Sequence, residues 1–219
     1  DASGNAATLT LASPGASGSL GANKALVLDG VVATVSSVTS TTADGSYKIN
    51  TTIPIKVTFS EAVYVTGTPQ LTLETGSSDA VVNYTSGSGS ADLIFNYTVA
   101  SGHTSSDLDY TSTSALALNS GTIKDVVGNT STLTLASPGG TNSLGANKAL
   151  IIDTTVPTVA SVTSTSSDGS YKVGDVIPIK ITFSEAVTVS GTPQLTLETG
   201  SSDAVVNYTS GSGSADLIF

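Results

Sequence analysis

The sequence predicts an all-β protein made of tandem antiparallel modules of about 124 residues. Two observations carry this prediction. Residues 1–95 match residues 125–219 without a gap, and 73 of the 95 aligned positions are identical. Along many short segments apolar and polar residues alternate, which is the period of a half-buried strand. No segment carries the 3.6-residue apolar period of a helix, so strands are expected throughout.

The phase of the repeat divides the chain into three parts. Residues 30–153 are predicted to form one complete repeat. Residues 1–29 correspond to the C-terminal end of a preceding repeat, and residues 154–219 to the N-terminal part of a following one. Because the two copies are so similar, the sequence favours an array of repeats over a protein of two unrelated domains.

Within the complete repeat, alternation is clearest at residues 53–59, 71–74 and 91–99. Such alternation is typical of an antiparallel sheet with one buried and one solvated face. Turn signals such as Asp44-Gly45 separate the segments. Shorter strands are expected at residues 31–39, 80–85, 115–118, 132–135 and 149–152. Seven or eight short strands in a module of this size predict an immunoglobulin-like β-sandwich.

Two further segments bear on how repeats connect. Residues 138–148 break the alternation and are expected to form a long surface loop or a wide hairpin. The last strand runs through Asp153 to Pro157 almost directly into the next repeat, and proline favours an extended preceding residue. A linker this short predicts an extended and fairly stiff rod.

Charge and composition exclude several partners. The chain has 7 Lys, no Arg and 17 Asp or Glu, for a net charge of −10. It lacks the basic face of a nucleic-acid-binding protein, and no apolar run is long enough for membrane insertion. Cysteine is absent, so disulfides and thiol chemistry are excluded. The composition fits an extracellular or cell-surface protein and favours divalent cations as partners.

Catalytic patterns are weak, and no enzyme is expected. His103 is the single histidine, lies in a predicted loop, and is expected to be a surface residue. A zinc site would need more nitrogen or sulfur ligands, and the Gly-x-Ser-x-Gly nucleophile motif does not occur. Asp107 and Asp109 are better explained by turn or calcium roles than by glycoside hydrolysis. Several Asn-x-Thr or Asn-x-Ser triplets match the N-glycosylation pattern. In a bacterial chain so rich in Ser and Thr they are expected by chance, and in an archaeal or eukaryotic one glycosylation stays an alternative.

Several motifs resemble the bacterial Ig-like repeats of very large surface and motility-associated proteins, above all the SWM-type repeat. Similar modules fill the extender regions of giant calcium-dependent adhesins. The resemblance covers essentially the whole chain and implies an extracellular spacer made rigid by calcium. The motifs are DGSYK at residues 168–172, ITFSEAV at 181–187, GTPQLTLE at 191–198, DVVGN at 125–129 and IDTTVP at 152–157.

Calcium takes about 6–8 oxygen ligands, so the acidic and amide residues near a module junction are candidate ligands. These are Asp153 in the linker, Asp125 and Asn129 in the DVVGN turn, Glu185 after a strand, and Asp175. A bound cation would neutralise these carboxylates and fix the hinge. The alternative is that they only cap turns and keep the surface soluble.

The two junctions differ at position 175, where the first copy has Thr51. If Asp175 is a ligand, the first junction should bind calcium more weakly. If both junctions bind equally, Asp175 is not needed.

The function expected first is a structural spacer of a large extracellular adhesin or surface fibre. Its partners would be neighbouring repeats, and cell-surface or fibre components. A second hypothesis is a filament subunit in which identical chains complete one another by strand addition. A third is a carbohydrate- or protein-binding Ig-like module.

Overall fold

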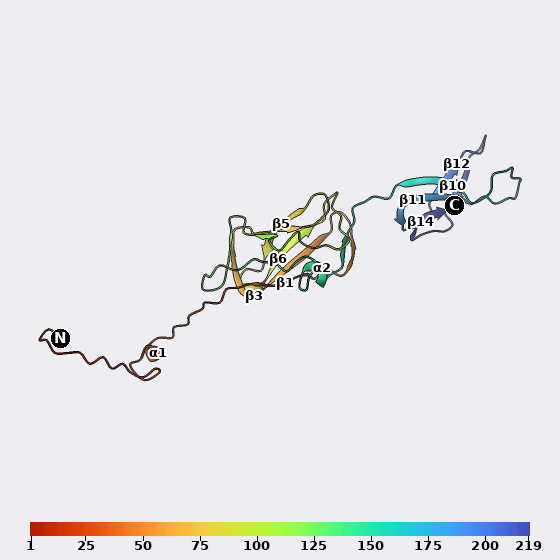
Figure 1. Ribbon diagram of the computed structural model, residues 1–219. Coiled ribbons are helices and arrows are strands. Elements are labelled where there is room, and N and C mark those ends of the chain that lie inside the picture. Colours follow the sequence, from red (N-terminus) through yellow and green to blue (C-terminus); the bar gives the residue numbers. More distant parts are fainter. The chain divides into compact units, whose positions relative to one another are not determined.

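The computed structural model describes residues 1–219 and is built mostly of strands (Figure 1). Strands hold 39% of the residues and helices 4%, so the prediction of an all-β protein is confirmed. The chain divides into two compact units, residues 1–154 and 155–219.

The first unit is organised around a sheet with the strand order β1-β3-β6-β5-β4-β7, while β8 pairs with the distal part of β3. These pairs are antiparallel, whereas β2 and β9 form a separate parallel pair. The strands are β1 (Val35–Ser40), β2 (Gly45–Tyr47), β3 (Thr52–Thr66), β4 (Gln70–Leu73), β5 (Ala80–Ser86), β6 (Ser90–Thr98), β7 (Leu116–Ala117), β8 (Thr122–Lys124) and β9 (Leu150–Ile152). The parallel pair departs from the expectation of a purely antiparallel module.

The core follows the alternation in the sequence. Ile53, Ile55 and Val57 of β3 are fully buried, and the residues between them are partly exposed. Phe95 and Tyr97 of β6 point into the same core. Burying an apolar side chain of this size stabilises the fold by about 1.5–3 kcal/mol. The alternating pattern therefore places β3 and β6 at the centre of the unit.

Strand β3 changes partner along its length. Residues 52–58 pair with β6, Val63 pairs with β6 again after a register shift, and residues 64–66 pair with β8. The sequence predicted only residues 53–59 as a strand, because the apolar alternation weakens after Phe59. Such irregularities bend a strand and re-aim its side chains. Glu61 lies in the bend.

Several short elements differ from the prediction. Strands β2 and β8 were not expected, and residues 132–135 form no strand. Thr132 instead makes an isolated bridge to Thr34, with its backbone N–H 2.8 Å from the Ala33 carbonyl oxygen. Three-residue strands are set by distant partners, so their own sequence carries little signal.

Residues 138–148 are not only loop. They contain the one-turn helix α2 (Leu144–Asn147), whose Leu144 side chain is fully buried. The hydroxyl of Ser143 accepts a hydrogen bond from the Ala146 backbone N–H at 3.1 Å and so caps the helix. A single turn is too short to show a helical period, which is why the prediction missed it.

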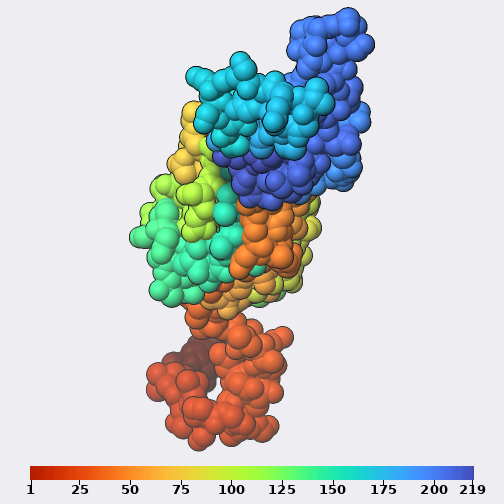
Figure 2. All heavy atoms as spheres, turned by 90° about the vertical axis from the view of Figure 1, so that its right-hand side faces the viewer, coloured from red at the N-terminus to blue at the C-terminus, as the bar shows by residue number.

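Residues 1–28 repeat the sequence of this closing segment but are largely exposed. Helix α1 (Leu20–Asn23) buries no residue. Leu11 and Leu28 are 89% and 97% exposed, whereas their equivalents Leu135 and Ile152 are 3% and 2% exposed. Residues 11–21 curl around a hollow of about 390 Å³, visible in the red segment of Figure 2. These side chains need the body of a repeat to bury them.

The second unit repeats part of the pairing of the first copy, in a three-stranded sheet β10-β11-β14 and a separate pair β12-β13. It contains β10 (Val159–Ser164), β11 (Ile179–Val187), β12 (Gln194–Leu197), β13 (Ala204–Asn207) and β14 (Ser214–Ile218). Val159 pairs with Phe183 as Val35 pairs with Phe59, and both ladders shift register at the same place. Leu217 is the buried hydrophobic residue of this unit.

Candidate metal centre

Three carboxylates converge at one end of the first unit. Asp29, Glu61 and Asp125 each offer an oxygen, and these oxygens all lie within 4.8 Å of one another. Asp29 belongs to residues 24–34, which lead into β1 and are called the lead-in segment below. Glu61 lies in the bend of β3, and Asp125 directly follows β8. The cluster thus joins the lead-in segment to two strands of the module.

The DVVGN turn holds Asp125 in place. One carboxylate oxygen accepts hydrogen bonds from the backbone N–H groups of Val127, Gly128 and Asn129 at 3.0, 2.8 and 2.8 Å. The other accepts one from the Asn129 side chain at 2.7 Å. Burial raises the pKa of Asp125, but these hydrogen bonds outweigh it and leave the pKa below its usual value of 3.8. Asp125 is therefore an anion at neutral pH.

This turn is a local structure. In the exposed copy at residues 1–5, one carboxylate oxygen of Asp1 accepts from the backbone N–H groups of Ser3 and Asn5, each at 2.9 Å. The Asn5 side chain donates to the second oxygen at 2.8 Å. Since the turn forms without a packed module around it, the Asp-x-x-Gly-Asn sequence alone specifies it.

Asn129 connects the turn to the lead-in segment. Its side-chain Nδ2 lies 3.3 Å from the Asp29 carbonyl oxygen and 3.4 Å from that of Val31. The Asp29 carboxylate in turn accepts a hydrogen bond from the Val31 backbone N–H at 3.0 Å. The Asn129 side chain thus holds two main-chain carbonyl oxygens of the lead-in segment against the module, beside the three carboxylates.

Glu61 supplies the unsatisfied group of the cluster. Its Oε1 is buried and has no hydrogen-bond partner, and Oε1 of Glu185, the same position in the second copy, is in the same state. A buried polar oxygen without a partner is destabilising. The ion pairs of the chain lie elsewhere, at Lys56, Lys148 and Lys180, so no lysine neutralises the cluster. Hard oxygen ligands of this kind suit Ca²⁺.

The structure brings together some of the predicted ligands. Asp125 belongs to the cluster, and the Asn129 side chain donates a hydrogen bond to it. Asp153 and Glu185 are the second-copy equivalents of Asp29 and Glu61, and they lie in the first and second units, respectively. Asp153 and Glu185 thus occupy the same repeat positions as two of the clustered carboxylates but belong to the other copy, and their role as calcium ligands stays a prediction. The offset of 124 residues was the signal that could have identified Asp29 and Glu61 directly.

Asp175 is placed apart from this set. Its carboxylate accepts a hydrogen bond from the Lys172 backbone N–H at 2.9 Å and so caps its own turn. Asp175 precedes β11, whereas Glu185 lies near the other end of that strand. The strand from Ile179 to Glu185 alone spans about 20 Å, so Asp175 and Glu185 lie toward opposite ends of β11. The first-copy cluster also forms without a carboxylate at Thr51.

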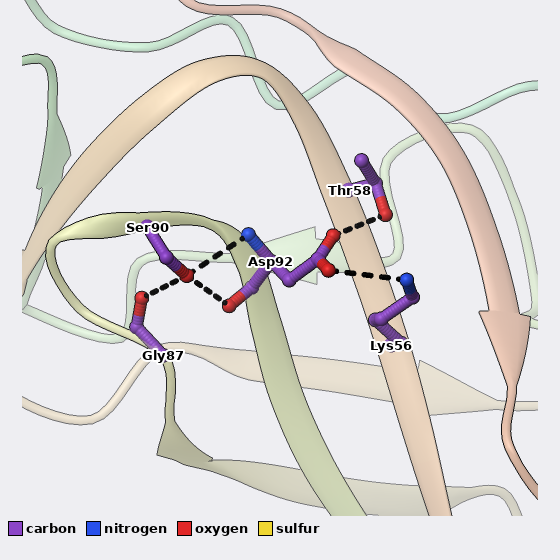
Figure 3. Close-up of polar contacts among 5 residues, drawn as sticks. All are labelled: Lys56, Thr58, Gly87, Ser90 and Asp92. Carbon is purple, nitrogen blue, oxygen red and sulfur yellow. Dashed lines mark hydrogen bonds and ion pairs between the residues drawn. The ribbon is translucent and has the colours of Figure 1, made fainter.

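A second polar cluster lies on the exposed face of β3 and β6 (Figure 3). Asp92 accepts hydrogen bonds from Thr58 at 2.6 Å and from Lys56 at 3.1 Å. The hydrogen bond from Thr58 is the largest influence and, with Lys56, keeps the pKa of Asp92 below its usual value. The same trio recurs at Lys180, Thr182 and Asp216. This arrangement ties two strands together and has no unsatisfied group.

His103 differs from the expected surface residue. It is half-buried, its Nδ1 lies 3.0 Å from the Tyr97 hydroxyl, and the two rings are stacked with centroids 5.7 Å apart. Burial raises the pKa of Tyr97 to about 12. The neighbouring Thr154 donates to the His103 carbonyl oxygen at 2.9 Å. His103 thus packs the end of the module where the chain leaves β9.

Comparisons with known proteins add no assignment. A scan against protein-family models found no match, and searches of curated proteins and of solved structures found none either. The resemblance to SWM-type repeats therefore stays a prediction. No helix in the structure combines the length and the apolar character needed to cross a membrane.

Proposed function

We propose that this chain is a non-enzymatic spacer from a large extracellular adhesin or surface fibre, built of Ig-like β-sandwich repeats in series. The repeats are joined by short linkers that bound calcium makes rigid. The proposal rests above all on one observation, the convergence of Asp29, Glu61 and Asp125 where the lead-in segment meets the module.

The position of the cluster explains how calcium would act. Asp29 comes from the chain entering the module, whereas Glu61 and Asp125 belong to the module. A cation that takes oxygens from all three links the segment to the module and removes their mutual repulsion. The carbonyl oxygens of Asp29 and Val31, and the Asn129 amide if turned by 180°, are further oxygen ligands at the same place. The linker would then lose its freedom to bend.

Small-angle X-ray scattering tests the spacer function. The chain and a version lengthened by one complete repeat are measured in calcium and in EDTA. In calcium, the maximum dimension should grow by the full length of one module for the added repeat, and it should shrink in EDTA. A dimension that barely grows with the added repeat would show repeats folded back on each other and would refute the spacer.

The exposed leucines of residues 9–28 favour a second candidate, a filament subunit completed by identical chains. Leu20 and Leu26 are 69% and 67% exposed, whereas their equivalents Leu144 and Leu150 are fully buried. Sedimentation velocity over a wide concentration range tests it. Association that disappears in a Leu20→Ser, Leu26→Ser double variant supports the filament subunit, and a monomer at all concentrations refutes it.

A further inference from the structure

The two central strands β5 and β6 separate at one end and leave a groove between them. They pair only at Tyr84–Phe95 and Ser86–Ile94. Beyond this point residues 80–83 of β5 pair with β4 alone, and residues 96–98 of β6 pair with β3 alone. Both open stretches line one surface hollow of about 470 Å³, together with Asp79 and His103.

The backbone of β5 presents to this groove groups that no neighbouring strand pairs with, and of these the Asn83 carbonyl oxygen accepts only a 3.4 Å hydrogen bond from the Thr85 hydroxyl. The Tyr84 N–H donates to the Pro69 carbonyl oxygen at 2.8 Å, on the side of β4. Because the directions of successive backbone groups alternate along a strand, Ala80 and Val82 also face β4. Val81 and Asn83 therefore turn their backbone groups toward the groove, where no strand pairs with them.

The facing stretch of β6 is open in the same way. Val99 exchanges hydrogen bonds with Asn50 and Thr51 on the side of β3, both at 2.9 Å. By alternation Asn96 and Thr98 face β5. The Asn96 N–H reaches only the Thr85 hydroxyl, at 3.3 Å, which marks the narrow end of the groove. Beyond that point the facing edges of β5 and β6 do not pair with each other.

The open edge of β5 carries few of the residues that block strand addition. Exposed edges often carry lysine or proline. Residues 79–85 read DAVVNYT and contain neither, and Val81 is 57% exposed. In the second unit β13 pairs only with β12, so the same stretch of the second copy is also unpaired on one side.

We infer that this groove binds an extended peptide as an added β-strand. The strand would hydrogen-bond to Val81 and Asn83 on one side or to Asn96 and Thr98 on the other, as in β-augmentation. The groove has a buried apolar floor at Ala80, Val82 and Tyr97, and an exposed polar rim. A suitable peptide therefore alternates apolar and polar side chains.

Charge selects further among such peptides. Asp79 stands on the rim, is exposed and takes part in none of the ion pairs of the chain. The chain as a whole carries a net charge of −10. The partner is therefore a basic strand with a lysine or arginine beside Asp79. This inference does not depend on the spacer function or on calcium, because the groove lies on β5 and β6 away from the three carboxylates.

Fluorescence anisotropy with a labelled peptide tests the proposal on the full chain. The probe is acetyl-Thr-Lys-Val-Thr-Val-Thr-amide, and its control carries N-methyl groups on alternate backbone amides. We expect the probe to bind, and Val81→Pro to weaken binding by about tenfold or more because it removes an N–H that faces the groove but none that pairs with β4. The matched variant Val81→Thr keeps the N–H and should bind as the wild type does.

Further readouts separate the alternatives. Asp79→Asn should weaken the lysine probe but not a version with glutamine in its place. Loss of binding with the N-methylated probe supports strand addition even if Val81→Pro fails to fold. Equal binding by the N-methylated probe, or no binding up to millimolar peptide, overturns the proposal. Binding of oligosaccharides in this groove without peptide binding also overturns it and assigns the site to glycans.

Discussion

Replacing Glu61 by glutamine separates a calcium site from a cluster of acids that only shape the surface. Extracellular calcium modules bind with dissociation constants of about 10⁻⁴–10⁻³ M. With a constant of about 10⁻⁴ M, about 5 mM calcium stabilises the folded state by about 2.3 kcal/mol. A module of 124 residues unfolds with an entropy of about 0.26 kcal/mol/K, so its Tm should rise by about 9 °C.

Compared with the wild type, Glu61→Gln should have an equal or higher Tm in EDTA and a lower Tm in calcium. In EDTA, Glu61→Gln removes a charge from beside two carboxylates and leaves a neutral amide that can donate to them, so its Tm should equal or exceed that of the wild type. In calcium it loses a ligand, and most of the 9 °C rise should disappear. Differential scanning calorimetry measures both. Glu74→Gln, at an exposed residue outside the cluster, is the matched control and should leave both Tm values unchanged.

Two results would refute this reasoning. A wild-type Tm that does not respond to about 5 mM calcium would show that the cluster binds no calcium of useful affinity. A Glu61→Gln variant that is strongly destabilised in EDTA would show that Glu61 supports the fold directly. The buried Oε1 of Glu61 would then stabilise the fold itself and would not be a metal ligand.

Three further predictions concern the fold. The pKa of Asp92 lies below its usual 3.8, so ionised Asp92 stabilises the folded state above about pH 4. This stabilisation is lost as the pH falls through the lowered pKa. Because the Asp92 side chain is 43% exposed, it amounts to about 0.2–1 kcal/mol. Acid titration of stability should show this loss in the wild type and not in Asp92→Asn. Leu71→Ala, at a fully buried residue, should lower the free energy of unfolding by about 2–5 kcal/mol in urea titrations, and Leu195→Ala, at its half-buried equivalent, by clearly less. Ser143→Ala removes the cap of α2 and should cost about 1 kcal/mol in the same titrations, whereas Ser19→Ala, at the cap of the exposed α1, should leave the unfolding of the module unchanged. Equal effects of the two serine variants would contradict the difference between the two helices.

Alternation of apolar and polar residues predicted the long core strands but not the short elements that depend on distant partners. The alternation at residues 53–59 and 91–99 correctly identified the two longest runs of core strand, in β3 and β6. The parallel pairing of β2 with β9 could not be predicted, because it joins residues more than 100 positions apart through three-residue strands. Helix α2 escaped prediction because a single turn is too short to show a helical period, although the same four residues form the exposed helix α1 as well.

In the candidate metal site, some residues could be predicted from the local sequence and others only from the folded structure. Asp125 and Asn129 were predicted because their turn is a property of five consecutive residues. Glu61 becomes distinctive only through its position in the bend of β3, where its Oε1 is buried without a partner. The same oxygen of Glu185 is buried without a partner in the second unit, so this burial is a property of the folded strand and its neighbours, which no local pattern describes.

The parallel pair of β2 and β9 also determines how the module would carry a load. The chain leaves the module directly after β9, and Asp153 still donates a backbone hydrogen bond to the Tyr47 carbonyl oxygen at 3.0 Å. A pull on Asp153 acts along β9, whose neighbour β2 runs in the same direction. The hydrogen bonds between them are then loaded in shear and have to break together, whereas an antiparallel hairpin pulled at its open end unzips one bond at a time. In a series of such modules under tension, the last strand of each module, β9, would therefore be the element that resists unfolding.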